Sequence, residues 1–304
     1  MRRVMRLATI LLALVAVGSS AEADWVLTTL GSFNGSNGSA PRDSLIADAQ
    51  GNLYGTTSAG GANGSGTVFK LTTGTSPNLA ALSSFNGTNG ATPFGGLIAD
   101  AQGNLYGTTV GGGANNDGTV FKLTTGANPT LTTVASFNGG DGSRPYGGLI
   151  IDTQGNVYGT TSGGGANGDG TVFKLTPGAN PTLTTLATFN GANGNLPTAG
   201  LLADGQGNLY GTTEGGGAHG DGTVFKLTTG GIPTLTTLAS FSGSNGISPF
   251  FGSLIADAQG NLYGTTDQGG ANGDGTVFKL TTGVSPTLTT LASFNGSNGS
   301  TPTK

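Results

Sequence analysis

A block with a period of 52 or 53 residues recurs five times in this chain of 304 residues, and it constrains the fold more than any other feature. The five copies begin at Leu45, Leu97, Leu149, Leu201 and Leu254. An aspartate near the start of each copy gives spacings of 52, 52, 52 and 53 residues: Asp48, Asp100, Asp152, Asp204 and Asp257. A period of this length is typical of repeat architectures, in which each small unit buries its apolar face against the next unit.

Each unit contains four short stretches that read as strands, as the second copy illustrates. These stretches cover residues 96–100, 104–109, 118–124 and 130–137. Between the first two lies a turn in which Gly103 suits the left-handed conformation and the Asp100 carboxylate can accept hydrogen bonds from the backbone. Four short strands per unit are the pattern of a propeller blade. The sequence therefore predicts an all-β protein, a β-propeller of about five four-stranded blades, with the first strand central and the fourth at the outer edge.

The two ends of the repeat array predict how a ring would close. Residues 26–33 match the fourth strand of a unit, so the chain holds five copies of the first three strands and six of the fourth. Because a closed ring has fewer exposed strand edges, we expect residues 26–33 to complete the last blade beside its third strand at 276–280. The last fourth strand, residues 287–294, competes for the same edge. We expect a single domain over residues 24–304, either a closed ring of five blades or a piece of a larger ring.

The first 23 residues have the pattern of a secretory signal peptide. Three arginines precede an apolar run at residues 7–17, and small residues precede a cleavage site after Ala23. The run is too short to cross a membrane comfortably, and no second apolar segment follows it. We therefore expect a chain that is secreted, periplasmic or on the cell surface, with no transmembrane segment in its mature part.

The composition excludes several kinds of chemistry. The chain has no cysteine, which rules out disulfides, thiol catalysis and cysteine-bound zinc. The leader carries three of the 11 basic residues and one of the 15 acidic ones, so the mature part has a net charge near −6. An acidic chain without a basic patch disfavours nucleic acid as a partner.

The repeated unit carries a family resemblance. The segment Asp-Ala-Gln-Gly-Asn-Leu-Tyr-Gly-Thr-Thr, followed by Gly-Gly-Ala-Asn-Gly-Asp-Gly-Thr-Val-Phe-Lys-Leu, resembles the GloVer-type tandem repeat in all five copies. Members of that family are exported bacterial proteins with varied C-terminal anchors, and this chain differs from many of them in ending without an apolar anchor. The resemblance implies an exported, propeller-like repeat protein, and it brings no catalytic residues. The layout is also similar, at a weaker level, to NHL-type propellers.

Residues that break the repeat are the candidates for a binding site, because loops on one face of a rigid scaffold carry specificity. The position after the paired threonines varies as Ser58, Val110, Ser162, Glu214 and Asp267, and the position after the loop proline varies as Arg42, Phe94, Tyr146, Thr198 and Phe250. The candidate ligand-binding residues are Phe94, Tyr146, Phe250, Arg144, Glu214, Asp267 and the only histidine, His219. Aromatic rings beside polar side chains suit sugar rings, so we predict a non-enzymatic scaffold that binds a glycan or an extracellular protein.

Two other functions stay open. Glu214 and Asp267, in adjacent units, could be the paired carboxylates of a carbohydrate-active hydrolase or lyase at the channel mouth. That chemistry also needs a carboxylic acid with a raised pKa, and the sequence shows burial of neither residue. Alternatively, the protein is a purely structural repeat protein whose variable loop residues reflect drift. The turn aspartates and the third-strand lysines recur in every unit, so we expect them to serve the blade.

The sequence predicts no cofactor. Four of the five glycine-rich loops carry one aspartate each in a pattern similar to calcium-binding repeats, at Asp117, Asp169, Asp221 and Asp274, and the first loop has Ser65 there. Calcium prefers roughly six to eight oxygen ligands, and a loop with one carboxylate supplies few of them. A glycine-driven turn therefore explains these loops better than a calcium site. We expect the protein to be a monomer.

Overall fold

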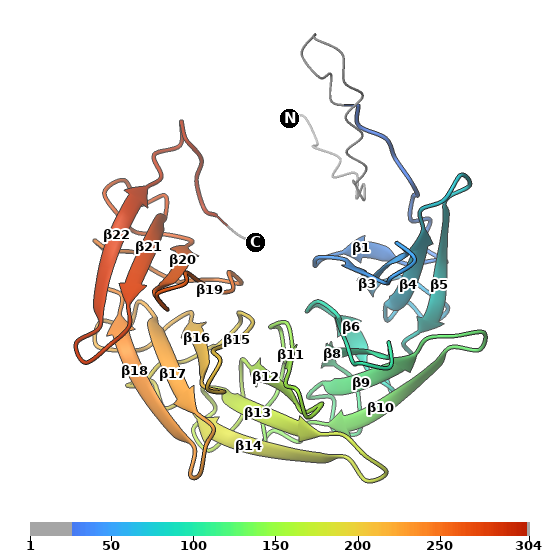
Figure 1. Cartoon of the computed structure of the whole chain (residues 1–304), viewed down its shortest axis with the longest axis horizontal. Coiled ribbons are helices and arrows are strands. Elements are labelled where there is room, and N and C mark those ends of the chain that lie inside the picture. The colour runs from blue at the N-terminus through green and yellow to red at the C-terminus, as the bar shows by residue number, and fades with distance from the viewer. Residues whose placement is uncertain (1–25, 303–304) are drawn as a thin grey trace.

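The computed structural model describes residues 26–302, and the predicted signal peptide at residues 1–23 lies outside them. The described chain is all β, with five antiparallel sheets that correspond to the five repeats (Figure 1). The predicted all-β architecture of four-stranded blades is therefore confirmed. The described residues contain no helix that is long and apolar enough to cross a membrane.

The strands of the five blades follow the repeat. The first blade contains β2 (Ile46–Ala47), β3 (Leu53–Ala59), β4 (Thr67–Thr72) and β5 (Asn78–Ser84), and the second contains β7 (Ile98–Ala99), β8 (Leu105–Gly111), β9 (Thr119–Thr124) and β10 (Thr130–Ser136). The third contains β11 (Ile150–Ile151), β12 (Val157–Thr161), β13 (Thr171–Thr176) and β14 (Thr182–Thr188). The fourth contains β15 (Leu202–Ala203), β16 (Leu209–Thr213), β17 (Thr223–Thr228) and β18 (Thr234–Ser240). The fifth contains β19 (Ile255–Ala256), β20 (Leu262–Thr266), β21 (Thr276–Thr281) and β22 (Thr287–Ser293). Two further strands, β1 (Ser39–Pro41) and β6 (Ala91–Pro93), pair with β3 and β8.

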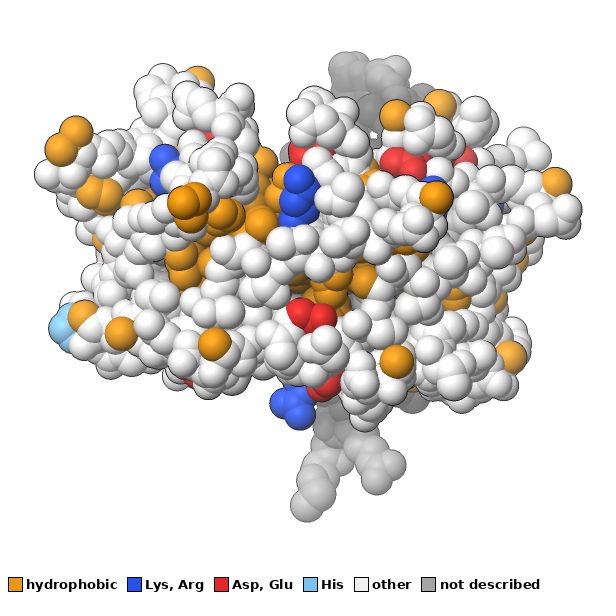
Figure 2. Space-filling model, turned by 90° about the horizontal axis from the view of Figure 1, so that it is seen from below, with side chains coloured by type: hydrophobic (Ala, Val, Ile, Leu, Met, Phe, Trp, Pro, Cys, Tyr) orange, Lys and Arg blue, Asp and Glu red, His pale blue; other side chains and the backbone are white. Residues whose placement is uncertain are grey.

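The blades are arranged around a common axis as an open ring. In each blade the short first strand lies nearest the axis and the fourth strand lies on the outside, as the sequence predicts (Figure 1). The first and last blades lie on opposite sides of an opening in the ring (Figure 1). On the side of the molecule seen in Figure 2, most of the surface consists of uncharged side chains and backbone.

The predicted closure by the N-terminal strand is wrong. β22 completes the fifth blade by pairing with β21, from Thr281 opposite Thr287 to Thr276 opposite Ser293. Residues 26–33 lie instead against the first blade, where the Phe33 ring is 5.0 Å from the Phe69 ring. The physical reason is locality, because β22 follows β21 through a short turn, whereas residues 26–33 would have to cross the opening between the first and fifth blades to reach that edge.

The blades are held together by apolar clusters that lie between neighbours rather than within one sheet. The cluster between the second and third blades contains Tyr106, Val120 and Phe137 from one and Leu149, Val157, Phe173 and Leu175 from the other. The Phe137 and Phe173 rings meet edge to face at 5.1 Å. Gly159 makes room for this packing, because a Cβ there would lie 2.7 Å from the Phe173 ring. The invariant glycine after the strand tyrosine therefore serves the core.

The repeated turn aspartates also serve the blade. Asp152 accepts hydrogen bonds from the Asn156 backbone and side chain, from Gln154 N–H and from the Tyr158 hydroxyl, at 2.7 to 3.0 Å. Partial burial raises the pKa of Asp152, but these hydrogen bonds outweigh it and hold the pKa below its usual range. Burial and the Asp152 carboxylate raise the pKa of Tyr158 to about 12. Lys174 stands over the Tyr158 ring at 5.8 Å.

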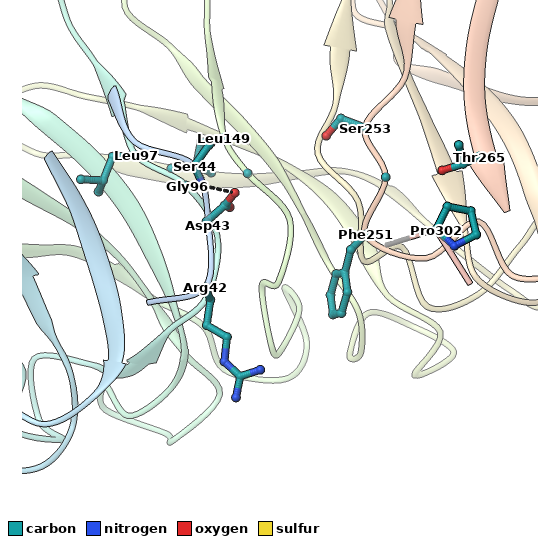
Figure 3. A pocket seen from close by; sticks show the side chains of 12 residues that line it. Arg42, Asp43, Ser44, Gly96, Leu97, Leu149, Phe251, Ser253, Thr265 and Pro302 are labelled. Atoms are coloured by element: carbon teal, nitrogen blue, oxygen red, sulfur yellow. Dashed lines mark hydrogen bonds between the residues drawn. The ribbon is translucent and has the colours of Figure 1, made fainter. Parts of the chain in front are cut away.

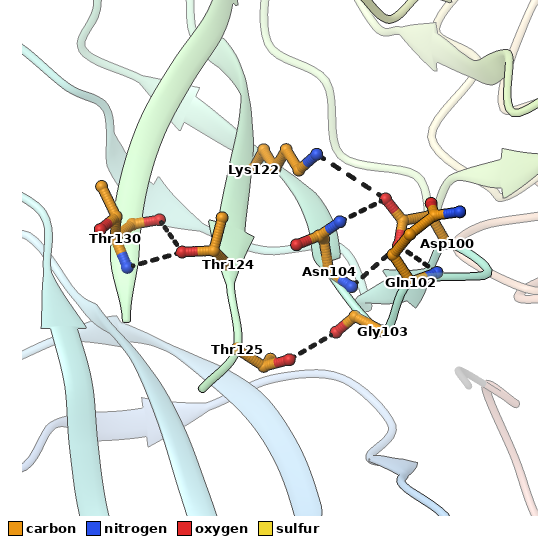
Figure 4. A network of polar contacts seen from close by, with 8 residues as sticks. All are labelled: Asp100, Gln102, Gly103, Asn104, Lys122, Thr124, Thr125 and Thr130. Carbon is orange, nitrogen blue, oxygen red and sulfur yellow. Dashed lines mark hydrogen bonds and ion pairs between the residues drawn. The ribbon is translucent and has the colours of Figure 1, made fainter. Parts of the chain in front are cut away.

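The turn of the second blade is a variant of the same network (Figure 4). Asp100 accepts hydrogen bonds from Gln102 and Asn104, and Lys122 Nζ lies 3.8 Å from its Oδ2. The Thr125 hydroxyl donates to the Gly103 carbonyl, which ties the turn after the third strand to the turn after the first. Both kinds of turn therefore share one face of the ring, which we call the turn face.

Candidate functional site

The variable loops share the opposite face, which we call the loop face. The loop that enters the fourth blade is joined to a loop of the third blade, because Leu196 N–H donates to the Asp169 carbonyl at 3.1 Å. The loop that enters the third blade is joined to the second in the same way, through Arg144 N–H and the Asp117 carbonyl at 2.9 Å. Hydrogen bonds between blades therefore fix the positions of the residues that break the repeat.

Four aromatic rings from three different loops meet on the loop face. Phe94 and Tyr146 pack edge to face with ring centres 5.1 Å apart. Phe251 lies 5.1 Å from Phe94 and 5.9 Å from Tyr146, and its neighbour Phe250 is 3.8 Å away. All four side chains are half-buried, so each keeps part of its ring exposed. We call Phe94, Tyr146, Phe250 and Phe251 the aromatic cluster.

Phe251 is the member of this cluster that the sequence analysis missed. It belongs to the connection that makes the last spacing 53 rather than 52 residues. Its φ is +52°, and Gly252 N–H donates to the Phe250 carbonyl at 2.7 Å across it. A tight turn of this kind with positive φ is strained for a bulky residue, and such strain concentrates at functional sites. The odd spacing was the signal that could have pointed to Phe251.

A cavity of about 760 Å³ lies beside the aromatic cluster at the axis of the ring (Figure 3). It is lined by Arg42, Asp43, Ser44, Gly96, Leu97, Gly148, Leu149, Phe251, Gly252, Ser253, Thr265 and Pro302. In Figure 3, Asp43 and Ser44 approach it from one side and Ser253 and Thr265 from the other. The cavity therefore combines an aromatic ring, hydroxyl groups, glycine backbone and one charged group of each sign.

Arg42 joins the aromatic cluster to the first blade. Its guanidinium carbon stands 5.2 Å from the centre of the Phe94 ring, within the range of a cation–π contact. Its Nε donates a 3.4 Å hydrogen bond to Ser58 Oγ, which itself donates to the Ala40 carbonyl. Arg42 is one of the variable positions of the repeat, but it was not among the predicted site residues.

Glu214 and Asp267 are close enough to interact, as their adjacent units suggest. Burial raises the pKa of Glu214, and the negative charge of Asp267 raises it further. Both side chains are half-buried. Their backbone N–H groups donate to the Leu196 and Ser248 carbonyls, so each stands beside the loop that enters its own blade.

The loop that enters the fourth blade also contains two buried polar atoms that lack a hydrogen-bond partner among the described residues. They are Thr198 Oγ1 and Asn195 Oδ1. Asn195 exchanges two backbone hydrogen bonds with Gly215, the residue after Glu214. A buried polar atom without a partner is costly, and water or a ligand can satisfy it.

The structure does not bring Arg144 or His219 to the aromatic cluster. The Arg144 side chain is exposed, although its backbone lies in the loop that carries Tyr146. His219 is exposed as well, and the preceding Ala218 N–H donates to Ser240 Oγ at the end of the outer strand β18. His219 therefore stands at the perimeter rather than at the axis. Within residues 26–302, no group of three or more histidine, aspartate or glutamate side chains is placed to hold a metal ion.

Comparison with known proteins shows the family. The Gloeobacter/Verrucomicrobia repeat matches residues 19–154 and 125–304, so the chain belongs to this family of repeat proteins. No curated protein sequence matches the chain.

Solved structures with a similar fold share little sequence with this chain. A gluconolactonase of Xanthomonas campestris gives a TM-score of 0.50 at 16% identity, over 88% of this chain and 77% of that one. A protein of unknown function from Dyadobacter fermentans gives 0.50 at 10% identity over 84% of each chain. PorZ, a surface component of the type-IX secretion system of Porphyromonas gingivalis, gives 0.50 at 13% identity, over 87% of this chain and 36% of PorZ. These similarities show a propeller-type fold and nothing of the chemistry.

Proposed function

We propose that this chain is an exported, non-enzymatic propeller scaffold that binds a glycan at the axis of its loop face. The observation that carries the proposal is the aromatic cluster, in which three loops far apart in the sequence place half-exposed rings beside one cavity. Sugars stack on such rings through their C–H faces, while hydroxyl groups and backbone amides take their polar edges. The signal-peptide pattern of residues 1–23 supports release to the periplasm, the cell surface or the medium.

A glycan array with the mature chain tests this function. We expect defined glycans to bind, and the combined variant Phe94→Ala, Tyr146→Ala and Phe251→Ala to lose roughly a hundredfold in affinity, because each ring contact is worth about 1 kcal/mol. His219→Ala at the perimeter is the matched control and should bind like the parent.

Circular dichroism melts of the same variants show whether they keep the fold. If the triple variant is folded and binds as well as the parent, the ligand does not bind at the aromatic cluster. If no glycan of the array binds, the glycan-binding function is wrong, and the protein binds a protein ligand or has a purely structural role.

A second function, hydrolysis of a glycosidic bond, is favoured by the coupling of Glu214 and Asp267. A carboxyl group with a raised pKa can donate a proton to a leaving group while a second carboxylate assists on the other side of the sugar. Burial and the neighbouring Asp267 shift the pKa of Glu214 upward, the direction that a general acid needs, so Glu214 is the candidate acid and Asp267 the candidate second carboxylate.

Release of reducing ends from the glycans that bind the mature chain tests the hydrolase function. If Glu214 is the acid, Glu214→Gln should slow release by about a hundredfold or more. The His219→Gln variant, altered at the perimeter, should keep the parental rate. A parent chain that binds a glycan and never cleaves it leaves the non-enzymatic scaffold as the function.

A further inference from the structure

Arg42 lies at the rim of the axial cavity, where two neighbouring side chains contact its guanidinium group. It stands where the other units have an aromatic residue or a threonine, namely Phe94, Tyr146, Thr198 and Phe250. One face of its guanidinium group lies against the Phe94 ring, and its Nε bonds Ser58 Oγ. An arginine with these contacts loses little conformational freedom when it binds a ligand.

Arg42 forms no salt bridge within the part of the chain that the structure describes. The single salt bridge found between residues 26 and 302 joins Lys122 to Asp100 on the turn face. With Nε bonded to Ser58, the two terminal nitrogens of the exposed Arg42 stay available. A planar pair of N–H donors fits a carboxylate in bidentate geometry.

The cavity wall next to Arg42 narrows the class of ligand. Asp43 lines the same cavity, and its Oδ1 accepts the Ser44 N–H at 2.7 Å. A carboxylate repels a ligand with several negative charges, yet it accepts hydrogen bonds from hydroxyl groups. Ser253 and Thr265 add hydroxyl groups on the far side (Figure 3). The lining therefore suits a molecule with one carboxylate and several hydroxyls.

We infer that the axial cavity binds a sugar acid, such as a uronic acid residue of an acidic glycan, with its carboxylate on Arg42. This inference rests on the proposed glycan-binding function, and it further specifies that the glycan carries a negatively charged carboxylate. The cavity volume of about 760 Å³ falls within the range of small-molecule sites, about 300 to 1,000 Å³. Phe251, which lines the cavity, supplies the aromatic surface for the sugar ring.

Calorimetric titration of the mature chain tests this assignment with uronate disaccharides, each paired with its neutral methyl ester. We expect each acid to bind at least about tenfold more tightly than its ester, because a hydrogen bond to a charged group is worth more than one to a neutral group. Arg42→Gln should remove that difference, and Arg42→Lys, which keeps the charge without the planar fork, should retain part of it. Arg144→Gln removes an exposed arginine outside the cluster and should change nothing.

The outcomes separate this inference from the proposed function. The sugar-acid assignment is overturned if acids and esters bind equally and if an Arg42→Gln variant that melts like the parent binds both as the parent does. The cavity is then a site for neutral glycans. If acids, esters and all glycans of the array fail to bind, both the assignment and the glycan-binding function fall.

Discussion

Replacing Phe137 by alanine is expected to destabilise the protein by about 3 to 5 kcal/mol, whereas the same change at Phe294 should cost less than about 2 kcal/mol. The two residues directly follow the equivalent outer strands β10 and β22, in nearly the same local sequence. Phe137 has no exposed surface, because the third blade covers it and Phe173 meets its ring. Phe294 is only half-buried, since no further blade covers it among the described residues.

Urea unfolding of the parent and both variants measures this difference as a shift in the midpoint at constant slope. The comparison tests whether the ring is open, because the two sites differ mainly in whether a following blade covers the phenylalanine side chain. Equal losses at Phe137 and Phe294 would mean that the face of the last blade is covered in solution, either by closure of the ring or by a second chain.

The second large effect is expected at the inner edge of the ring. Gly147 lies so close to the next loop that an added Cβ would stand 2.4 Å from the Ala199 carbonyl oxygen and 3.1 Å from Thr160 Oγ1. That carbonyl is fixed by a 3.2 Å hydrogen bond from Thr160, so it cannot move away freely. Gly147→Ala should therefore destabilise the protein by about 1 to 3 kcal/mol through overpacking.

The neighbouring glycine provides the control. A Cβ at Gly148 meets nothing within 4 Å, and neither glycine has the positive φ that disfavours alanine. The free energy of unfolding of Gly148→Ala should then be within about 0.5 kcal/mol of that of the parent, or slightly higher, because alanine lowers the conformational entropy of the unfolded chain. Thermal melts of the two variants check the pair. A Gly147→Ala protein as stable as Gly148→Ala would show that the inner loops are not in contact.

The repeat was enough to predict the strands and turns of each blade, but it was not enough to predict whether the ring closes. Gly103 and Asp100 indicated the first turn from local chemistry alone, and the structure shows that turn. Ring closure depends on the rotation between neighbouring blades, which is set by side-chain packing at each junction and adds up along the chain. Periodicity carries no information on that rotation, so residues 26–33 were assigned to the wrong end of the ring.

The candidate site was predictable in part for a similar reason. Phe94, Tyr146 and Phe250 were found because they break the repeat at one structurally equivalent position, and equivalent positions of a propeller converge on its axis. His219 also breaks the repeat, but its position in the loop lies beside an outer strand. Phe251 was missed because its place depends on the left-handed backbone of a single extra residue. A broken repeat therefore identifies variable residues, and distance from the axis decides which of them meet.

A crystal structure of the mature chain with the sugar that binds it most tightly tests the central claim most directly, namely that binding occurs where the repeat is broken at the axis. The account predicts the sugar ring against Phe251 and its polar groups within reach of Arg42 and Ser253. A sugar bound between the repeated turns of the turn face, or at the perimeter near His219 with the axial cavity vacant, would contradict it.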